Sequence, residues 1–285
     1  GREFFTDRFN INYVSWELEE YPDSWLPVLN LFDEIWAISD FVAESIRKKT
    51  NLPVRTMPIP VDCAIIHKYA RSHFNLLADK FLFLFYFDMS SSTYRKNPQA
   101  VIAAFEQAFS KDNSKVHLVI KVNRIKGRRE FAKLYVDLKN LAKEDKRITI
   151  IDKVLNRDEI LSLIDCCDCY VSLHRAEGFG MGMAEAMKMA KPVIATNYSG
   201  NLQFMNKDNS CLVDYKLVPV KKSEYIFSKG QYWAEPDIEH AAQYMRKIVN
   251  DTEFSNKISS NAKEFIDKNL GCEVIAEYCK KRFTT

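Results

Sequence analysis

Two glutamates enclose a short glycine-rich stretch, Arg175–Met187, which reads RAEGFGMGMAEAM. Three of the chain's 8 glycines lie in it, and Glu185 follows Glu177 by eight positions. A carboxylate can accept two hydrogen bonds from adjacent sugar or ribose hydroxyls, and glycine lets the backbone come close to a ligand. The pattern therefore favours a ligand with an anionic middle and hydroxyl-bearing ends. The plainer alternative is a strand–helix turn with Glu177 as a solvated charge.

The runs on either side of this stretch predict how it is positioned. Cys169–Leu173 is short and apolar, as in a buried strand, whereas Met181–Ala190 is rich in helix formers and Pro192–Thr196 predicts the next strand. A strand, a glycine turn and a helix bring unpaired N–H groups and the positive end of a helix dipole to the carboxyl end of the strand. A phosphate or diphosphate would bind there without any side chain.

A second polar loop follows a second apolar strand. Phe81–Phe87 is continuously apolar, as in a sheet buried on both faces, and Gln99–Phe109 has the apolar spacing of a helix. Between them, Arg95 and Lys96 are the best candidate cations for a diphosphate, because arginine offers a fork of donors and lysine a compact charge. Their alternative role is a solvated charge pair at the entry of a helix.

For two further residues, the sequence allows either a role in the site or a structural role. Lys121 lies near the end of the predicted strand His117–Val122, where it either faces the same crevice or points to water. His174 precedes Glu177 and could act at the diphosphate or as an acid. The sequence offers His174 no partner, so we favour a hydrogen-bonded structural histidine.

The glycine-rich stretch resembles a known family. Glu177 to Glu185 has the E-x7-E pattern of retaining, nucleotide-sugar-dependent glycosyltransferases of family 4, which have the GT-B fold. The surrounding SLHRAEGFGMGMAEAM and KPVIATNYSGN look like the donor-site core of that family. The resemblance covers nearly the whole chain and is strongest from Phe81 to Tyr215. It implies that Glu177 is the catalytic residue facing the transferred sugar and that Glu185 holds the ribose.

The resemblance also implies a donor site built from several loops. The amides around Phe179–Met181 would meet the sugar and diphosphate, and the loop Asp152–Leu155 would touch the base. The family has a glycine-arginine pair at the end of this strand, where this chain has Phe87-Asp88. It has a lysine-glycine pair later, where this chain has Lys96-Asn97. Lys96 therefore matches the family pattern better than Arg95 does. With Lys121 included, the predicted donor-binding residues are Arg95, Lys96, Lys121, Val154, Leu155, Gly178, Phe179, Gly180, Met181 and Glu185.

The predicted fold class is α/β of the GT-B type: a Rossmann-like, doubly wound parallel-sheet donor domain plus an incomplete second Rossmann-like domain. Residues 1–75 would be part of an N-terminal, acceptor-side domain, residues 76–265 the nucleotide-sugar-binding domain, and residues 266–285 a crossover helix. The chain begins Gly1-Arg2, and the earlier strands expected of the N-terminal domain are absent from it. We therefore expect a missing N-terminal part of the same enzyme, either upstream or supplied by another chain.

The remaining elements follow from periodicity and turn residues. Further strands are predicted at 11–16, 33–39, 54–57, 148–151 and, as the final strand, 211–215. Further helices are predicted at 25–32, 41–49, 131–143, 158–165, 202–205, 238–250, 253–265 and 272–283. Residues 220–232 predict an irregular loop, and residues 61–80 predict the connection between domains.

Composition limits the classes of partner. The chain has 285 residues, 47% of them hydrophobic, and a net charge of +3, which does not indicate nucleic acid. No apolar run approaches the ~20 residues that span a bilayer, and we expect no secretory signal peptide. The basic run Arg124–Arg129 is expected to be solvated, with contact to an acidic partner or anionic lipid left open.

The 7 cysteines form no disulfide framework, which fits a reducing cytoplasm. Cys166, Cys167 and Cys169 are expected to be ordinary buried thiols, because they lack a zinc-type spacing. The predicted location is cytoplasmic, with peripheral contact at the inner face of the membrane left open.

The predicted function is that of a retaining glycosyltransferase (a hexosyltransferase, EC 2.4) that moves a sugar from a nucleoside-diphosphate sugar to a glycan or lipid-linked acceptor. Surface polysaccharide biosynthesis is the expected setting, with no cofactor and no metal. One alternative is a sugar phosphorylase or sugar-nucleotide epimerase of the same fold, although no pyridoxal-phosphate lysine is identifiable. The other is a degenerate domain that binds a nucleotide sugar or a partner without activity of its own.

Overall fold

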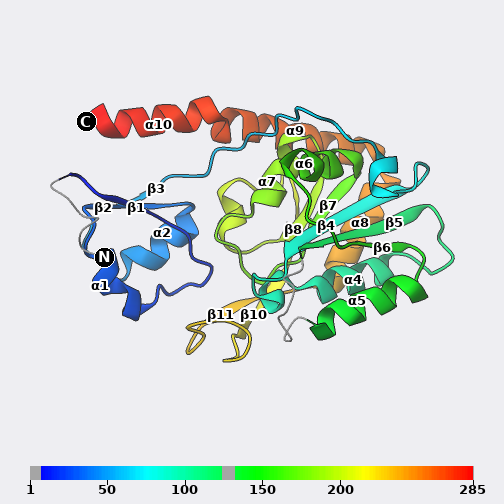
Figure 1. Ribbon diagram of the computed structural model, residues 1–285, viewed down its shortest axis with the longest axis horizontal. Coiled ribbons are helices and arrows are strands. Elements are labelled where there is room, and N and C mark those ends of the chain that lie inside the picture. Colours follow the sequence, from blue (N-terminus) through cyan, green and yellow to red (C-terminus); the bar gives the residue numbers. More distant parts are fainter. Residues whose placement is uncertain (1–7, 124–131, 285) are drawn as a thin grey trace.

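Strand pairing divides the chain into a small and a large parallel sheet (Figure 1). The computed structural model describes residues 8–123 and 132–284. The small sheet has the order β1 (Ile11–Val14), β2 (Glu34–Ala37), β3 (Val54–Thr56). The large sheet has the order β6-β5-β4-β7-β8-β9, formed by Ile148–Ile151, Val116–Asn123, Phe81–Asp88, Cys169–Ser172, Val193–Thr196 and Cys211–Val213 respectively.

Helices alternate with these strands along the chain. Their bounds are α1 Leu26–Leu29, α2 Asp40–Arg47, α3 Thr93–Lys96, α4 Pro98–Ala108, α5 Ala132–Glu144, α6 Arg157–Cys166, α7 Met181–Lys188, α8 Ile238–Asn250, α9 Thr252–Leu270 and α10 Cys272–Thr284. Short 3-10 turns occupy Asp23–Trp25, Arg71–Phe74 and Gly200–Gln203. The α/β class and the doubly wound parallel sheet are confirmed.

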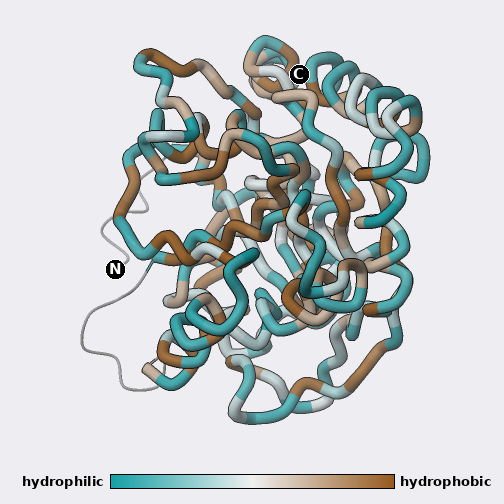
Figure 2. The backbone as a smooth tube through the Cα atoms, turned by 90° about the vertical axis from the view of Figure 1, so that its right-hand side faces the viewer, coloured by the Kyte–Doolittle hydropathy of each residue, from teal (hydrophilic) through white to brown (hydrophobic). Residues whose placement is uncertain are grey.

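The large sheet separates two hydrophobic cores. In β4, Phe83, Phe85 and Phe87 enter the core under α4, α5 and α8, whereas Leu82 and Leu84 enter the core under α6 and α7. This alternation follows from the two-residue period of a strand. Both faces of β4 are therefore covered, which is why its sequence is an unbroken apolar run. Figure 2 shows brown apolar segments through the interior and outer helices that alternate between brown and teal.

A hairpin that the sequence did not predict follows the large sheet. Strands β10 (Tyr215–Pro219) and β11 (Tyr232–Pro236) pair antiparallel. The strand predicted at 211–215 is present as β9, but it is not the final strand. The loop 220–231 that joins them is named here the hairpin loop. The exposed side chains of β10 gave no clear alternation between apolar and polar positions. The short helix α3 was likewise missed inside a predicted polar loop.

The last helix, α10, returns to the small sheet (Figure 1). Arg282 on α10 forms an ion pair with Glu34 of β2, and Glu34 is 1% exposed. The rings of Phe283 and Trp36 pack together with their centroids 5.8 Å apart.

The proposed division of the chain into domains at residues 75 and 265 stays a prediction. The basic run Arg124–Arg129 lies outside the described residues. No helix in the described part of the chain is both long and apolar enough to cross a bilayer.

We expect Arg282→Ala to lower the free energy of unfolding, because it removes a charged partner of a buried carboxylate. Burial would raise the pKa of Glu34, but hydrogen bonds from Arg282 and Trp36 outweigh burial and lower that pKa. The stabilisation should therefore be present at neutral pH and fade as the pH falls below about 4. Urea unfolding at several pH values measures it. Lys280→Ala, an exposed change on the same helix, is the control; an equal loss in both variants would contradict the role of the pair.

Candidate functional site

The glycine-rich turn joins β7 to α7 at the carboxyl end of the large sheet. Gly180 has φ +94°, a left-handed conformation that favours glycine, and it comes directly before α7. The Glu177 amide donates to Ser199 Oγ at 2.8 Å, and the Gly200 amide donates to Glu177 O at 2.8 Å. A Cβ on Gly200 would lie 2.0 Å from Gly178 O, so the two loops approach too closely for any side chain there.

The same turn contacts the small-sheet half of the chain. Ser39 Oγ donates to Gly178 O at 2.7 Å and also caps α2 by accepting from the Val42 amide. A Cβ on Gly178 would lie 3.0 Å from Trp16 O. The backbone of the turn is thus held from both halves of the chain.

The carboxylate of Glu177 lies between two cations. Its Oε2 is 3.1 Å from Arg95 Nη1 and its Oε1 is 2.5 Å from Lys96 Nζ. Glu177 is 7% exposed and Arg95 4%. Burial would raise the pKa of Glu177, but the charges of Arg95 and Lys96 outweigh burial and hold that pKa well below its usual range. Glu177 is therefore an anion at any physiological pH.

Glu185, the residue predicted to hold the ribose, is 1% exposed, and its carboxylate has partners of its own. Tyr86 Oη donates to Glu185 Oε2 at 2.8 Å, and Arg157 forms an ion pair with the other oxygen. Arg157 also donates to the carbonyl of Asp62 at 2.8 Å. Burial raises the pKa of Tyr86, so its hydroxyl stays a donor. The Arg157 side chain is 54% exposed, whereas the carboxylate that it contacts is buried.

A cavity of about 330 Å³ lies against the glycine turn. Its walls include Lys96, Glu177, Tyr86 and the turn residues 178–183. The cavity therefore brings together a cation, an anion and a helix N-terminus. This set can neutralise a diphosphate and hold hydroxyls beside it.

The structure separates the predicted donor-binding residues into two groups. Lys96, Gly178, Phe179, Gly180 and Met181 line the cavity, as does Glu177. Arg95 lines a second cavity on the other side of Glu177, and Glu185 lies behind Tyr86. Lys96 and Glu177 contact each other in the wall of one cavity, while their roles in donor binding stay a prediction.

Besides Arg95 and Glu185, three more predicted donor residues do not line this cavity. Lys121 is 1% exposed and donates to Asn123, so it neither lines the cavity nor points to water. Burial lowers the pKa of Lys121. Val154 is 87% exposed and Leu155 half-buried. Their contact with a nucleotide base stays a prediction.

His174 has the structural role that the sequence favoured. It is fully buried, with Ser172 Oγ 3.1 Å from Nδ1 and Asn201 Oδ1 3.1 Å from Nε2. Burial lowers its pKa, which disfavours a charged imidazolium. The cysteines in the described residues are free thiols, with Cys167 and Cys169 buried and Cys166 half-buried. Within residues 8–123 and 132–284, no group of three or more His, Cys, Asp or Glu side chains could hold a metal ion.

Sequence reasoning missed Tyr86, Arg157 and Glu17. Tyr86 is a single hydroxyl in a run of phenylalanines, which was a usable signal. Arg157 begins α6 directly after Asn156, whose side chain forms a capping box with Glu159, so the helix start also could have been found. Glu17 comes from the small-sheet half, and no sequence pattern links it to Arg95.

Comparison with known proteins gives one curated relative and several solved structures. The Alpha-1,3/1,6-mannosyltransferase ALG2 of Dictyostelium discoideum is 25% identical over 170 residues, which are 59% of this chain and 36% of that protein. The chain thus spans little more than a third of that curated relative.

Two solved structures share the fold at low identity. Anabaena Alr3699/HepE, in complex with UDP and glucose, superposes with a TM-score of 0.73 at 17% identity. The match covers 96% of this chain and 71% of the HepE chain. A glycosyltransferase from Rickettsia africae ESF-5 gives a TM-score of 0.71 at 16% identity, covering 96% of this chain and 69% of its own.

A family model adds the assignment. Residues 76–265, more than half of the chain, match the model described as Glycosyl transferases group 1. These residues contain the large sheet, the glycine turn, Lys96 and both glutamates. The chain therefore belongs to the group 1 glycosyl transferases and has their Rossmann-like GT-B type of fold.

Proposed function

We propose that this chain is the donor-binding part of a retaining glycosyltransferase that moves a hexose from a nucleoside-diphosphate sugar to a glycan or lipid-linked acceptor. The observation that carries the proposal is the contact of Lys96 with Glu177 in the wall of the glycine-turn cavity. A cation for the diphosphate and an anion for the sugar lie side by side there, next to the N-terminus of α7.

A bound diphosphate would replace Glu177 as the ionic partner of Lys96. In this structure Glu177 neutralises the Lys96 ammonium, and burial lowers the pKa of Lys96 against that attraction. A bound diphosphate offers the same cation more oxygens, and the amides at the start of α7 add donors. Positive charge from these groups stabilises the leaving diphosphate, so the proposal needs no metal.

Glu177 would then face the sugar. Its strongly lowered pKa keeps it anionic, and an anion beside the anomeric carbon stabilises the positive charge that develops there. In the proposed step the bond from the anomeric carbon to the diphosphate breaks, and the acceptor oxygen bonds to that carbon from the same face. The acceptor's hydroxyl proton goes to the departing diphosphate oxygen.

Glu185 would exchange Arg157 for the ribose hydroxyls, while Tyr86 keeps the carboxylate in place. The named relatives support a hexose and a nucleotide: one is a mannosyltransferase, and another is in complex with UDP and glucose. Surface polysaccharide assembly, at the inner face of a membrane, is the setting that we propose.

We expect Glu185→Ala to weaken the binding of UDP or GDP by about 1–3 kcal/mol, roughly a 5- to 150-fold rise in Kd, because the ribose loses a charged acceptor. Inorganic pyrophosphate, which has no ribose, should bind both proteins equally. Calorimetry measures both. Glu106→Ala, the same change at an exposed position of α4, is the matched control. Equal nucleotide affinity in wild type and Glu185→Ala would remove the ribose role.

Glu177→Gln should reduce turnover in the full-length enzyme far more than it reduces binding of the nucleoside diphosphate. Glutamine keeps the shape but removes the charge, and only interactions that strengthen in the transition state change the chemical step. Nucleotide affinity should stay the same or rise, because Lys96 loses a competing partner. Turnover and affinity are measured in parallel, with Glu106→Gln as the control. Unchanged turnover, or an equal loss of affinity, would contradict the catalytic role.

A further inference from the structure

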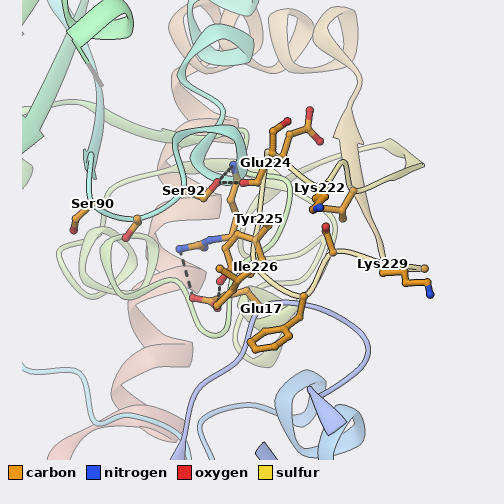
Figure 3. Close-up of a pocket in the computed structure, with 15 residues that line it drawn as sticks. Glu17, Ser90, Ser92, Lys222, Glu224, Tyr225, Ile226 and Lys229 are labelled. Atoms are coloured by element: carbon orange, nitrogen blue, oxygen red, sulfur yellow. Dashed lines mark hydrogen bonds and ion pairs between the residues drawn. The ribbon is translucent and has the colours of Figure 1, made fainter. Parts of the chain in front are cut away.

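A second cavity, of about 1160 Å³, opens beside the first. Both cavities share Glu17 and Ser91 in their walls, so they adjoin. The second is bounded by the loop after β4 and by the hairpin loop. Figure 3 shows Ser90 and Ser92 on one side, Lys222 and Lys229 on the other, and Tyr225 between them.

Glu177 and its two cations lie between the cavities. Lys96 lines the first cavity, Arg95 lines the second, and both contact the Glu177 carboxylate. Arg95 Nη2 also lies 3.5 Å from Glu17 Oε1. An occupant of the second cavity would therefore lie one side chain away from the carboxylate proposed to face the transferred sugar.

Arg95 also has an unused donor. The residue is 4% exposed, and within the described part of the chain no acceptor is hydrogen-bonded to its Nε. Buried guanidinium donors are normally satisfied, so Arg95 keeps unused hydrogen-bonding capacity beside the cavity that it lines. The observation is independent of the cavity's size.

The walls of the second cavity carry the groups that recognise sugars. Glu17 offers a carboxylate, fixed by Tyr225 Oη, which donates to its Oε2 at 2.5 Å. The serines of the wall add hydroxyls that both donate and accept. Phe227 adds an aromatic ring, 44% exposed, whose edge-to-face contact with Trp25 has a centroid distance of 5.1 Å. An apolar ring and a few placed polar groups suit a ligand with hydroxyls and a C–H face.

The hairpin loop is fixed to both halves of the chain. Ser92 Oγ donates to Glu224 O at 2.7 Å, next to the start of α3. Gln231 Nε2 donates to Glu20 O at 3.0 Å and its Oε1 accepts from the Glu20 amide at 3.2 Å. Phe227 has φ +50°, a left-handed conformation that favours glycine over other residues. These contacts hold the loop in place as a wall of the cavity.

We propose that the hairpin loop, with Glu17 and Arg95, forms the subsite for a hydroxyl-rich acceptor sugar. The inference rests on the proposed function, since an acceptor is needed only if sugar is transferred. It assigns the cavity to the glycan end of the acceptor, next to the proposed donor site, and makes the loop a determinant of acceptor choice.

Two adjacent lysines provide a matched test. Lys222 lines the cavity and Lys221 does not, while both are exposed. In Lys222→Trp the indole should fill part of the cavity; Lys221→Trp makes the same change in charge and size outside it. The probes are the methyl α-pyranosides of glucose, mannose and galactose, each added to the whole chain in the presence of saturating UDP or GDP. Saturation-transfer NMR measures their binding, and thermal unfolding checks that each variant is folded.

We expect at least one glycoside to bind alongside the nucleotide, with its signal reduced at least fivefold in Lys222→Trp and unchanged in Lys221→Trp. Phe227→Ala should reduce the signal as well, which tests the ring without filling the cavity. Displacement of the glycoside by the nucleotide, equal signals in the two lysine variants, or no glycoside binding by a chain that does bind nucleotide would overturn the inference. Failure to bind UDP and GDP would instead overturn the proposed function.

Discussion

The site depends on one buried charge cluster, in which the Glu177 carboxylate is compensated by Arg95 and Lys96. A buried carboxylate without partners would cost several kcal/mol, so the two cations and the carboxylate must occur together. Because both cations come from α3, this helix and the glycine turn are fixed relative to each other. In the proposed function, Lys96 would neutralise a bound diphosphate in place of Glu177.

The cluster further connects the two halves of the chain. Arg95 contacts Glu17, which is held by Tyr225 of the hairpin loop, and the glycine turn accepts a hydrogen bond from Ser39. The Arg282–Glu34 ion pair fixes α10 to the small sheet at a distance from the site. A change in how the halves are placed would therefore alter the surroundings of Glu177 directly, through named contacts.

The sequence was informative where one local pattern determines one local structure. The apolar run of β4 predicted that strand, and the helix formers after Gly180 predicted the helix that follows the glycine turn. The short helix α3, which carries Lys96, was not predicted. The sequence did not predict contacts between distant segments. Glu17 and Arg95, for example, come together only when the chain is folded. Sequence reasoning also failed for the exposed hairpin, whose strands pair with each other and need no apolar alternation.

The central claim is that a nucleoside diphosphate binds in the glycine-turn cavity and replaces Glu177 as the ionic partner of Lys96. Calorimetric titration of wild type and Lys96→Met with UDP and GDP tests it most directly, because methionine keeps most of the side chain's length and loses its charge. Lys133→Met on α5, an exposed lysine outside this cavity, is the matched control. The account predicts at least a tenfold rise in Kd for Lys96→Met and none for Lys133→Met. Equal affinity in all three proteins would contradict it.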